Sequence, residues 1–483
     1  MLIAHDLGTS GNKASLHDDT GRLLAAVTVG YPTRYAADTT SEQDPQDWWR
    51  AVVDATRSLL SSVPGAAGQV AGICVSGQMM GAVLLDGERR PVRPAMIWSD
   101  QRATAQATAL ADEIGTDAGY RLTGHRFAPT YTLPKLMWVR DNEPDAWAAT
   151  RAVCVAKDYV NLLLTGRLVT DHSDASSTDA YDLLAGTWSQ PLLDAAGIDA
   201  GLWPEIVDST TVIGTLTPQA AEELGLRPGT RVVAGGGDGP MASIGAGCTA
   251  PDSNGYVCLG TSAWFATTTT EPVFDPLRRS FTFRHVVPGL FTPCATSQTG
   301  AGSLQWLRGV LGGAIPDLVA AAGEVRAAED GLYFLPYLLG ERSPWWDAAA
   351  SGAFLGLRPH HGPAHLARAV LEGVGFNLAL CLAPLAPAGR PVDVIGGGAA
   401  SDSWLQLLSD IWGLPVRRRS VTDQANSLGA AVTGLVGLGL TDFTAAARLS
   451  VVEAEFEPSP DSALLGSHRQ RFEAAYHALS GWF

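Results

Sequence analysis

The sequence predicts an α/β protein made of two related domains with a cleft between them. The chain has 483 residues, of which 46% are hydrophobic and 17% charged. It can therefore bury packed cores, and it is too long for a single one. Predicted strands and helices alternate along it, as in a layered α/β fold. The tetrapeptide Leu-Gly-Thr-Ser at 7–10 recurs at 259–262, each time after a predicted strand and at the start of a hairpin. Such a repeat indicates two halves of one plan.

The first half begins with three strands joined by tight turns, over residues 2–7, 13–17 and 23–29. The turns are rich in Gly, Thr, Ser and Asp, so we expect an antiparallel meander. Asp44 and Pro45 are the expected N-cap and first residue of a helix that ends near 64–65. Its apolar residues at 48, 52, 55 and 59 fall on one face. Buried strands are predicted over 70–75 and 82–85.

The second half repeats the alternation of strands and helices. Strands are predicted over 231–234, 255–259, 263–269 and 392–395, and helices over 241–246, 363–385, 403–412 and 428–439. Ser401 or Asp402 is the expected N-cap of the helix at 403–412. Cys258 stands where the first copy of the repeat has Asp6.

Charge and cysteine content exclude several classes of protein. Lys and Arg number 33 against 49 Asp and Glu, a net charge of −16, which excludes a nucleic-acid-binding protein held by a general positive field. The six cysteines form no CxxC pair, so we expect reduced and mostly buried thiols. No basic leader and no run of about 18 uncharged apolar residues is seen. We therefore expect a cytoplasmic protein without nucleic-acid or membrane partners, with a homodimer as an open alternative.

Asp6 is a candidate metal ligand at the end of the first strand. It precedes a turn of small residues, 8–11, whose backbone N–H groups are free to hold a phosphate while a carboxylate holds its metal ion. A turn-capping Asp is an equally good interpretation of these residues. Lys13 could contact the same phosphate, although a solvated lysine at the end of a strand is an equal alternative.

Asp238 is a candidate general base because glycines at 235–237 and 239 let a ligand approach it closely. The segment 237–242 also fits a dinucleotide fingerprint, but Pro240 interrupts it and the next strand ends without an acidic residue. No P-loop sequence occurs. The glycines at 396–398, before a capped helix, could seat a nucleotide or allow tight helix–strand packing.

Two further segments suit a polyhydroxy ligand. Gln78, Met79 and Met80 follow a buried strand, and Asp100 and Arg102 follow Trp98. An aromatic face beside charged hydrogen-bonding groups is typical of sugar sites. The simpler alternatives are core packing for the two methionines and a surface ion pair for Asp100 and Arg102.

Taken together, these motifs resemble the FGGY family of carbohydrate kinases, and within it the xylulokinases. The matching segments, in chain order, are Asp6-Leu-Gly-Thr-Ser-Gly11, Ser41-Glu-Gln-Asp-Pro45, Gly77-Gln-Met79, Ile97-Trp-Ser-Asp100, Pro134-Lys-Leu136, Lys157-Asp-Tyr159, Gly235-Gly-Gly-Asp238, Leu259-Gly-Thr-Ser262, Phe334-Leu-Pro-Tyr337, Gly340-Glu-Arg342, Glu372-Gly-Val-Gly375 and Ile395-Gly-Gly-Gly-Ala399. The resemblance implies two actin-like ATPase (ribonuclease H-like) domains with a deep cleft, over residues 1–237 and 238–483. An ancestral duplication then explains the repeat.

The resemblance also implies an activity. The expected reaction is ATP-dependent transfer of the γ-phosphoryl group to a primary hydroxyl of D-xylulose, giving D-xylulose 5-phosphate, with Mg²⁺ as cofactor. A different ketose or polyol (ribulose, L-xylulose, a tetritol or a pentitol) is the alternative. In this interpretation Asp238 is the base and Asp6 helps to hold Mg²⁺, directly or through water. The implied sugar ligands are Gln78, Met79, Met80, Trp98, Asp100, Arg102 and Asp238. The implied nucleotide ligands are Gly8, Thr9, Ser10, Gly11, Lys13, Gly260, Thr261, Gly302, Gly397, Gly398 and Asp402.

Two residues depart from the pattern that this chain resembles. Xylulokinases have Met-His where this chain has Met79 and Met80, and Asp-Asn where it has Asp238 and Gly239. The missing His and Asn normally hydrogen-bond the ketose, and a buried hydroxyl left without a partner costs about 1–3 kcal/mol. We therefore expect altered sugar selectivity, and we expect Met80→His with Gly239→Asn to raise activity on xylulose.

Overall fold

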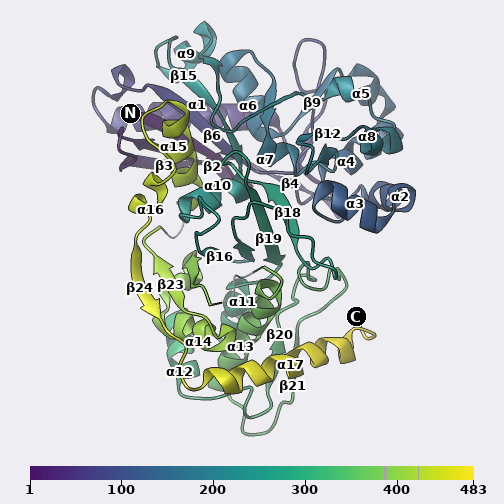
Figure 1. The fold of residues 1–483 in the computed structure, drawn as a ribbon, viewed down its shortest axis with the longest axis vertical. Coiled ribbons are helices and arrows are strands. Elements are labelled where there is room, and N and C mark those ends of the chain that lie inside the picture. Colours follow the sequence, from purple (N-terminus) through teal and green to yellow (C-terminus); the bar gives the residue numbers. More distant parts are fainter. Residues whose placement is uncertain (38, 386–388, 422–423) are drawn as a thin grey trace.

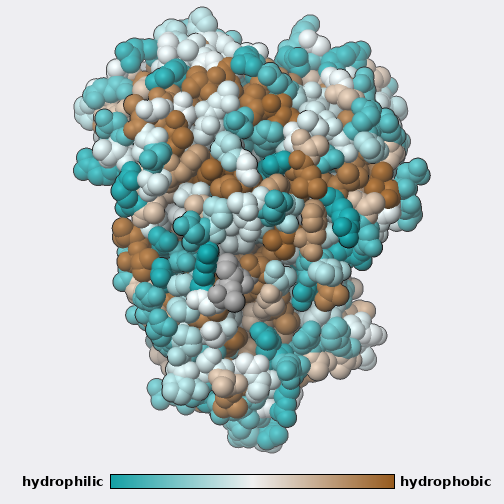
Figure 2. All heavy atoms as spheres, in the orientation of Figure 1, coloured by the Kyte–Doolittle hydropathy of each residue, from teal (hydrophilic) through white to brown (hydrophobic). Residues whose placement is uncertain are grey.

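The computed structural model describes residues 1–37, 39–385, 389–421 and 424–483. The chain forms two lobes, each built on one large sheet, with the N-terminal half in the upper lobe and most of the C-terminal half in the lower lobe (Figure 1). Hydrophilic and hydrophobic side chains are interspersed over both lobes on the face that Figure 2 shows.

The first sheet has six strands in the order β14-β15-β6-β1-β2-β3. They span Val212–Thr215, Arg231–Gly237, Gly72–Gly77, Leu2–Leu7, Gly11–His17 and Leu23–Gly30. β1, β2 and β3 form the predicted antiparallel meander, whereas β6 runs parallel to β1 and β15 runs parallel to β6. The carboxyl ends of β1 and β15 therefore lie at one edge of the sheet, and these are the ends that carry Asp6 and Asp238.

The second sheet repeats this plan. Its order is β18-β19-β17-β16-β22-β23-β24, with bounds Phe281–Arg284, Phe291–Ser297, Ala263–Ala266, Gly255–Leu259, Val392–Ile395, Val416–Arg419 and Val452–Phe456. β16, β17 and β19 form a second meander, and β22 and β23 follow in parallel as β6 and β15 do. The duplication predicted from the repeated tetrapeptide is thus present in the topology.

Helices cover both faces of the first sheet. Leu59 on α1 (Pro45–Ser62) and Val160 on α6 (Ala156–Thr165) pack with Ile3 on one face. Asp44 caps α1 as predicted, and its carboxylate accepts the N–H of Gln46 at 2.9 Å.

The opposite face is covered by α15 (Ala425–Gly437), a helix from the far end of the chain (Figure 1). α15 also packs on α10 (Asp238–Gly245) at very short range. A Cβ on Gly429 would lie 2.0 Å from the backbone oxygen of Met241, and one on Gly245 would lie 1.9 Å from that of Ala425. Only glycine permits this approach.

The second lobe is built around α13 (Pro363–Leu382), which is buried from Ala367 to its end. Around it pack α11 (Gly302–Leu311), α12 (Ile315–Gly323), α14 (Asp402–Trp412) and α17 (Ser462–Leu479). Ser401 caps α14, since its hydroxyl accepts the N–H of Trp404.

Smaller elements complete both lobes. The short strands are β4 (Arg34–Tyr35), β5 (Ser41–Gln43), β7 (Val83–Leu85), β8 (Ala95–Met96), β9 (Ala152–Cys154), β10 (Val169–Asp171), β11 (Tyr181–Asp182), β12 (Thr187–Trp188), β13 (Glu205–Val207), β20 (Tyr333–Leu335) and β21 (Ala353–Leu355). The remaining helices are α2 (Thr104–Ile114), α3 (Thr116–Thr123), α4 (Thr132–Asn142), α5 (Pro144–Ala149), α7 (His172–Ala175), α8 (Gln190–Ala196), α9 (Pro218–Leu224) and α16 (Ala445–Leu449), with 3-10 turns at Ala66–Gly68, Ala200–Leu202 and Gly397–Ala400.

Several predicted bounds were wrong. α10 begins at Asp238 and not at 241, because Pro240 falls in the first helical turn, where its missing N–H has no partner to lose. The strand before it extends to Gly237, since Gly236 and Gly237 still pair with β6. The strand predicted over 82–85 is present as β7 and is buried, and it pairs with β9 outside both large sheets.

The cysteines and the apolar helices agree with the sequence analysis in part. All six cysteines are free, and all but Cys258 are buried. Within the described residues one helix, α13, is long and apolar enough to cross a membrane. However, 89% of its apolar 18-residue segment is buried inside the second lobe. A buried core helix passes the same test, so this is weak evidence for a span.

Candidate active site

Asp6 and Asp238 meet at the carboxyl edge of the first sheet. The side chain of Asp6 points to the face covered by α15, and its Oδ1 accepts a long hydrogen bond of 3.4 Å from Nδ2 of Asn426. Asp238 is the first residue of α10, and its Oδ1 accepts the N–H of Gly239 at 2.8 Å. Asp6 is only 4% exposed. The buried carboxylate of Asp6 and the partly buried carboxylate of Asp238 therefore have few hydrogen-bond donors around them.

Burial shifts the pKa of both carboxyl groups upward. It raises the pKa of Asp6 to about 6, although the ammonium of Lys13 and hydrogen bonds oppose the shift. For Asp238, burial and then the negative charge of Asp6 raise the pKa to about 7. A carboxylate with a pKa near neutrality is suited to accept a proton from an alcohol, and the mutual repulsion would be relieved by a bound cation.

A cavity of about 250 Å³ lies directly over Asp238. Both lobes line it: Met79, Met80 and Trp98 from the first lobe, and Trp264 and Phe281 from the second. Its other lining residues are Gly239, Ala242, Tyr256, Cys258, Ser262, Phe283, Thr296, Arg342 and Asn426. We call it the acceptor cavity. Polar groups occupy part of its wall, and aromatic and other apolar side chains form most of the rest.

The backbone of Met80 is strained and is held from two sides. Its φ is +66°, an uncommon value for a residue other than glycine. Its carbonyl accepts a hydrogen bond from Nζ of Lys135 at 2.9 Å, and its N–H donates to Ser177 Oγ. Burial lowers the pKa of Lys135 to about 7. These contacts fix the segment that forms one side of the acceptor cavity.

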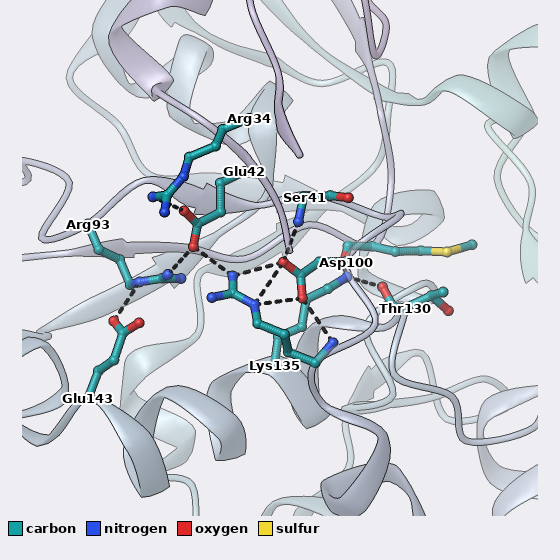
Figure 3. A network of polar contacts seen from close by, with 10 residues as sticks. Arg34, Ser41, Glu42, Arg93, Asp100, Thr130, Lys135 and Glu143 are labelled. Carbon is teal, nitrogen blue, oxygen red and sulfur yellow. Dashed lines mark hydrogen bonds and ion pairs between the residues drawn. The ribbon is translucent and has the colours of Figure 1, made fainter. Parts of the chain in front are cut away.

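Asp100 and Arg102 stand behind the cavity wall and not in it. Asp100 is fully buried, and it accepts hydrogen bonds from the backbone N–H of Ser41 and from the guanidinium of Arg102. Arg102 also pairs with Glu42 at 2.6 Å, and Glu42 pairs with Arg93 (Figure 3). A buried network thus fixes the loop that carries Trp98. The role predicted for Asp100 and Arg102 as sugar ligands stays a prediction; in this structure their charges are engaged by protein groups.

The first hairpin, 8–11, is anchored next to the cavity. Nε1 of Trp98 donates to Thr9 Oγ1 at 2.9 Å, and Nε2 of Gln43 donates to the Thr9 carbonyl at 2.6 Å. Gln78 belongs to this support, since its Nε2 donates to Gln43 Oε1, while its own Oε1 is buried and has no hydrogen-bond partner among the described residues. Lys13 lies across the strand pair from Asp6. Gln78 therefore contacts the hairpin support and does not line the acceptor cavity.

A larger cavity of about 640 Å³ lies in the second lobe. It is lined by Gly260, Thr261, Gly397 and Gly398, four of the predicted nucleotide ligands, together with apolar side chains such as Ile315 and Val319. Gly302 supports its rim, because its N–H donates to the Thr261 carbonyl at 3.1 Å. Asp402 pairs with Arg418 at the start of α14 and does not line the cavity. Its predicted contact with a nucleotide stays a prediction.

The two cavities share one hairpin. After β16, Gly260 and Thr261 line the larger cavity, whereas the next residue, Ser262, lines the acceptor cavity. A ligand that enters the large cavity can therefore extend along this turn toward Asp238. This junction is the arrangement that transfer of a group between two bound substrates requires.

A buried ionic cluster supports the strand that carries Asp238. Nζ of Lys157 lies 2.7, 3.3 and 3.4 Å from carboxylate oxygens of Asp158, Asp171 and Asp174. Burial opposes the ammonium, but the three carboxylates outweigh it and raise the pKa of Lys157. Oγ of Ser173 donates to Asp171 and accepts the N–H of Gly237 at 2.9 Å. The cluster therefore reaches the residue before Asp238.

A second group of possible metal ligands lies elsewhere in the second lobe. Asp330, His360 and His361 have ligand atoms within 4.8 Å of one another. However, Nδ1 of His361 accepts the backbone N–H of Arg358 at 3.1 Å. In the neutral ring the proton is then on Nε2, the nitrogen that faces Asp330. A protonated nitrogen has no free lone pair with which to bind a metal ion. We assign no metal ion to this group.

Several residues of the acceptor cavity carry no signal in the sequence that predicts their place there. Trp264, Tyr256 and Phe281 are apolar strand residues, and nothing in their pattern distinguishes them from core residues. Arg342 lies in the segment Gly340-Glu-Arg342, which carries the family resemblance, so that segment could have indicated it. Asn426 reaches Asp6 from a helix 420 residues further along the chain.

Comparisons with known proteins identify the family. The N-terminal domain model of the FGGY family of carbohydrate kinases matches residues 1–245, and the C-terminal domain model matches residues 255–438. The chain therefore belongs to the FGGY family of carbohydrate kinases, and it is a sugar kinase.

Individual relatives show which sugar kinases this chain is similar to. Xylulose kinase of Escherichia coli is 35% identical over 436 residues, covering 89% of each chain. Gluconokinase of Bacillus subtilis is 28% identical over 484 residues, covering 96% of this chain and 92% of the relative. The crystal structure of ligand-bound xylulose kinase from Lactobacillus acidophilus superposes with a TM-score of 0.93 at 28% identity, covering 99% of this chain and 98% of that one. The two-domain α/β fold that the sequence predicted is confirmed.

Proposed function

We propose that the protein is an ATP-dependent pentulose kinase that converts D-xylulose to D-xylulose 5-phosphate. The observation that carries this proposal is the hairpin shared by the two cavities. It would let ATP in the larger cavity direct its γ-phosphoryl group toward an alcohol held over Asp238. The similarity to xylulose kinases supports D-xylulose as the acceptor.

In this mechanism Asp238 takes the proton from the primary hydroxyl as the oxygen attacks the γ-phosphorus. The backbone N–H groups of the hairpins at 8–11 and 260–262 would orient the phosphate oxygens from opposite lobes. Positioning and charge neutralisation do most of the work in phosphoryl transfer. For a chain of net charge −16, the positive potential must be supplied locally.

Mg²⁺ fits the residues at this site. Asp6 offers a buried carboxylate with one long hydrogen bond, and its charge raises the pKa of Asp238. Carboxylate oxygens are the protein ligands that Mg²⁺ prefers. Asp6 would hold the ion, directly or through water, and the ion would neutralise charge on the phosphates.

A panel of acceptors tests the proposed substrate. ADP release is measured by a coupled assay with D-xylulose, ribulose, L-xylulose, gluconate, a tetritol and a pentitol. Among these six acceptors we expect the highest kcat/KM for D-xylulose. A higher value for another ketose or polyol would support the alternative, which Met80 and Gly239 favour because they replace polar side chains of the pattern. If no ADP is released with any of these acceptors, the result contradicts the proposal.

The pH dependence of the reaction follows from the state of Asp238. Its pKa is raised to about 7, so the base is protonated and inactive at lower pH. We expect kcat/KM to rise with pH through about 7 and then to level. The variant Asp6→Asn removes one cause of the raised pKa of Asp238. The residual kcat/KM of this variant should therefore reach its half-maximal value at a lower pH. A profile that is flat between pH 5 and 8 would argue against Asp238 as the base.

Variants at two adjacent glycines distinguish an effect on nucleotide binding from an effect on folding. A Cβ on Gly397 would meet nothing within 4 Å and would point into open space beside the large cavity, whereas one on Gly398 would lie 2.5 Å from Cγ of Leu259. We expect Gly397→Leu to raise the KM for ATP about tenfold, a loss of about 1.4 kcal/mol, with unchanged stability. The control Gly398→Ala should destabilise the protein by about 1–3 kcal/mol. An unchanged KM for ATP in Gly397→Leu would contradict the proposal that ATP binds in this cavity.

A further inference from the structure

The space beside Gly239 is occupied by an indole ring. A Cβ at this position would lie 3.2 Å from both Cη2 and Cζ2 of Trp264 and 3.7 Å from Sδ of Met79. A side chain at this position requires the indole to shift by a few tenths of an ångström. The loss of a side chain at 239 and the presence of Trp264 are therefore two parts of one arrangement.

The indole is held firmly in this place. Its Nε1 donates to the hydroxyl of Tyr256 at 3.0 Å, and that hydroxyl donates to the carbonyl of Gly239 at 3.5 Å. Tyr256 is fully buried. The ring of Phe281 meets the indole edge-on, with 5.9 Å between centroids and 66° between planes. Moving the indole would break these contacts.

The resulting wall is apolar and lies next to the base. Trp264, Met79 and Phe281 face the acceptor cavity on the side of Gly239, and they offer no hydrogen-bond acceptor to a sugar hydroxyl there. The polar groups Thr296, Arg342 and Asn426 also line the cavity. Aromatic faces pack well against C–H groups, whereas a hydroxyl that loses water without gaining a partner weakens binding.

We propose that Gly239 and Trp264 act as one specificity-determining pair, which selects an acceptor with C–H groups, and not a hydroxyl, facing the indole. The inference rests on the proposed kinase function and names the acceptor class as a monodeoxy ketopentose. We expect at least one of the 1-, 3- and 4-deoxy derivatives of D-xylulose to be phosphorylated with a kcat/KM at least equal to that of D-xylulose.

A single variant and a double variant test the pairing. Gly239→Asn alone should lower kcat/KM for every acceptor about tenfold or more, because the amide meets the indole. The expectation that Met80→His with Gly239→Asn raises activity on xylulose is corrected for the same reason, since Trp264 is still in place in that variant. Combining it with Trp264→Ala makes room for the amide, and it should reduce the ratio of deoxy to parent activity about tenfold or more. Trp264→Phe keeps an aromatic wall and should keep the ratio. Trp482→Ala, whose side chain is 86% exposed, is the control and should change nothing.

Binding measurements compare the deoxy and parent acceptors without turnover. The thermal stabilisation by each acceptor alone is measured for the wild type and for the four variants, whose unliganded melting curves report folding. Equal ratios in the wild type and the double variant, by kinetics or by binding, would overturn the pairing. Binding of the deoxy acceptors with the expected ratios but without ADP release would contradict the kinase proposal and leave the pairing supported.

Discussion

Asp238→Asn is expected to lower kcat about 10²–10⁴-fold, the usual contribution of a general base. The amide has the shape of the carboxyl group but cannot take the proton of the acceptor hydroxyl. KM for ATP should change little, because Asp238 lies in the acceptor cavity and not in the large one. Steady-state kinetics with D-xylulose measures both values. Activity within about fivefold of the wild type would exclude the assigned base.

The same variant should be more stable than the wild type at alkaline pH. The folded-state pKa of Asp238, about 7, lies well above the ordinary value of an aspartate carboxyl group, 3.8, so the folded protein binds this proton more tightly than the unfolded chain does. The stability that this provides is present at acid pH and is lost as the pH rises through 7. Asn is neutral throughout. The difference in melting temperature should therefore grow from pH 5 to pH 8, whereas Asp54→Asn, at an exposed position on α1, should show no such trend.

Lys157→Met is expected to lower the free energy of unfolding by about 3–5 kcal/mol, as for other buried ion pairs that lose one partner. The variant leaves Asp158, Asp171 and Asp174 buried without their cation. Urea titration measures the loss. It should be smaller at pH 5 than at pH 8, because burial raises the pKa of Asp158 and Asp174 and protonation removes their charge.

An exposed ion pair provides the matched control for this variant. Arg167 and Glu205 lie 3.1 Å apart with side chains 49% and 65% exposed. Arg167→Met should cost less than about 1 kcal/mol. If the two Met variants lose the same small amount, the cluster does not hold the strand of Asp238 in place.

The sequence predicted those parts of the fold that local patterns determine. The meander of the first lobe and the caps at Asp44 and Ser401 are encoded by alternation and by capping residues within a few positions, and the structure confirms them. The repeat predicted the second sheet because duplication preserves the strand that ends at Leu259 and the hairpin after it.

Long-range contacts explain what the sequence could not show. Trp264 follows the repeated hairpin closely, but its contact with Gly239 depends on how two lobes meet. The sequence pattern of Asp100 and Arg102 suits sugar ligands or a surface ion pair equally, and it gives no sign of their buried network with Glu42. No local pattern distinguishes a charge that faces a ligand from one that faces another buried charge.

The path of the chain through α15 has a consequence for synthesis of the protein. The first sheet ends with β15 at Gly237, but the helix that covers one of its faces ends at Gly437, 437 − 237 = 200 residues later. At about 5–20 residues per second the ribosome needs about 10–40 s for this stretch. For that time the apolar side chains of Leu2, Ala4 and Val233 lack their contacts with α15. The newly made first lobe should therefore bind chaperones, and chains truncated before residue 425 should aggregate.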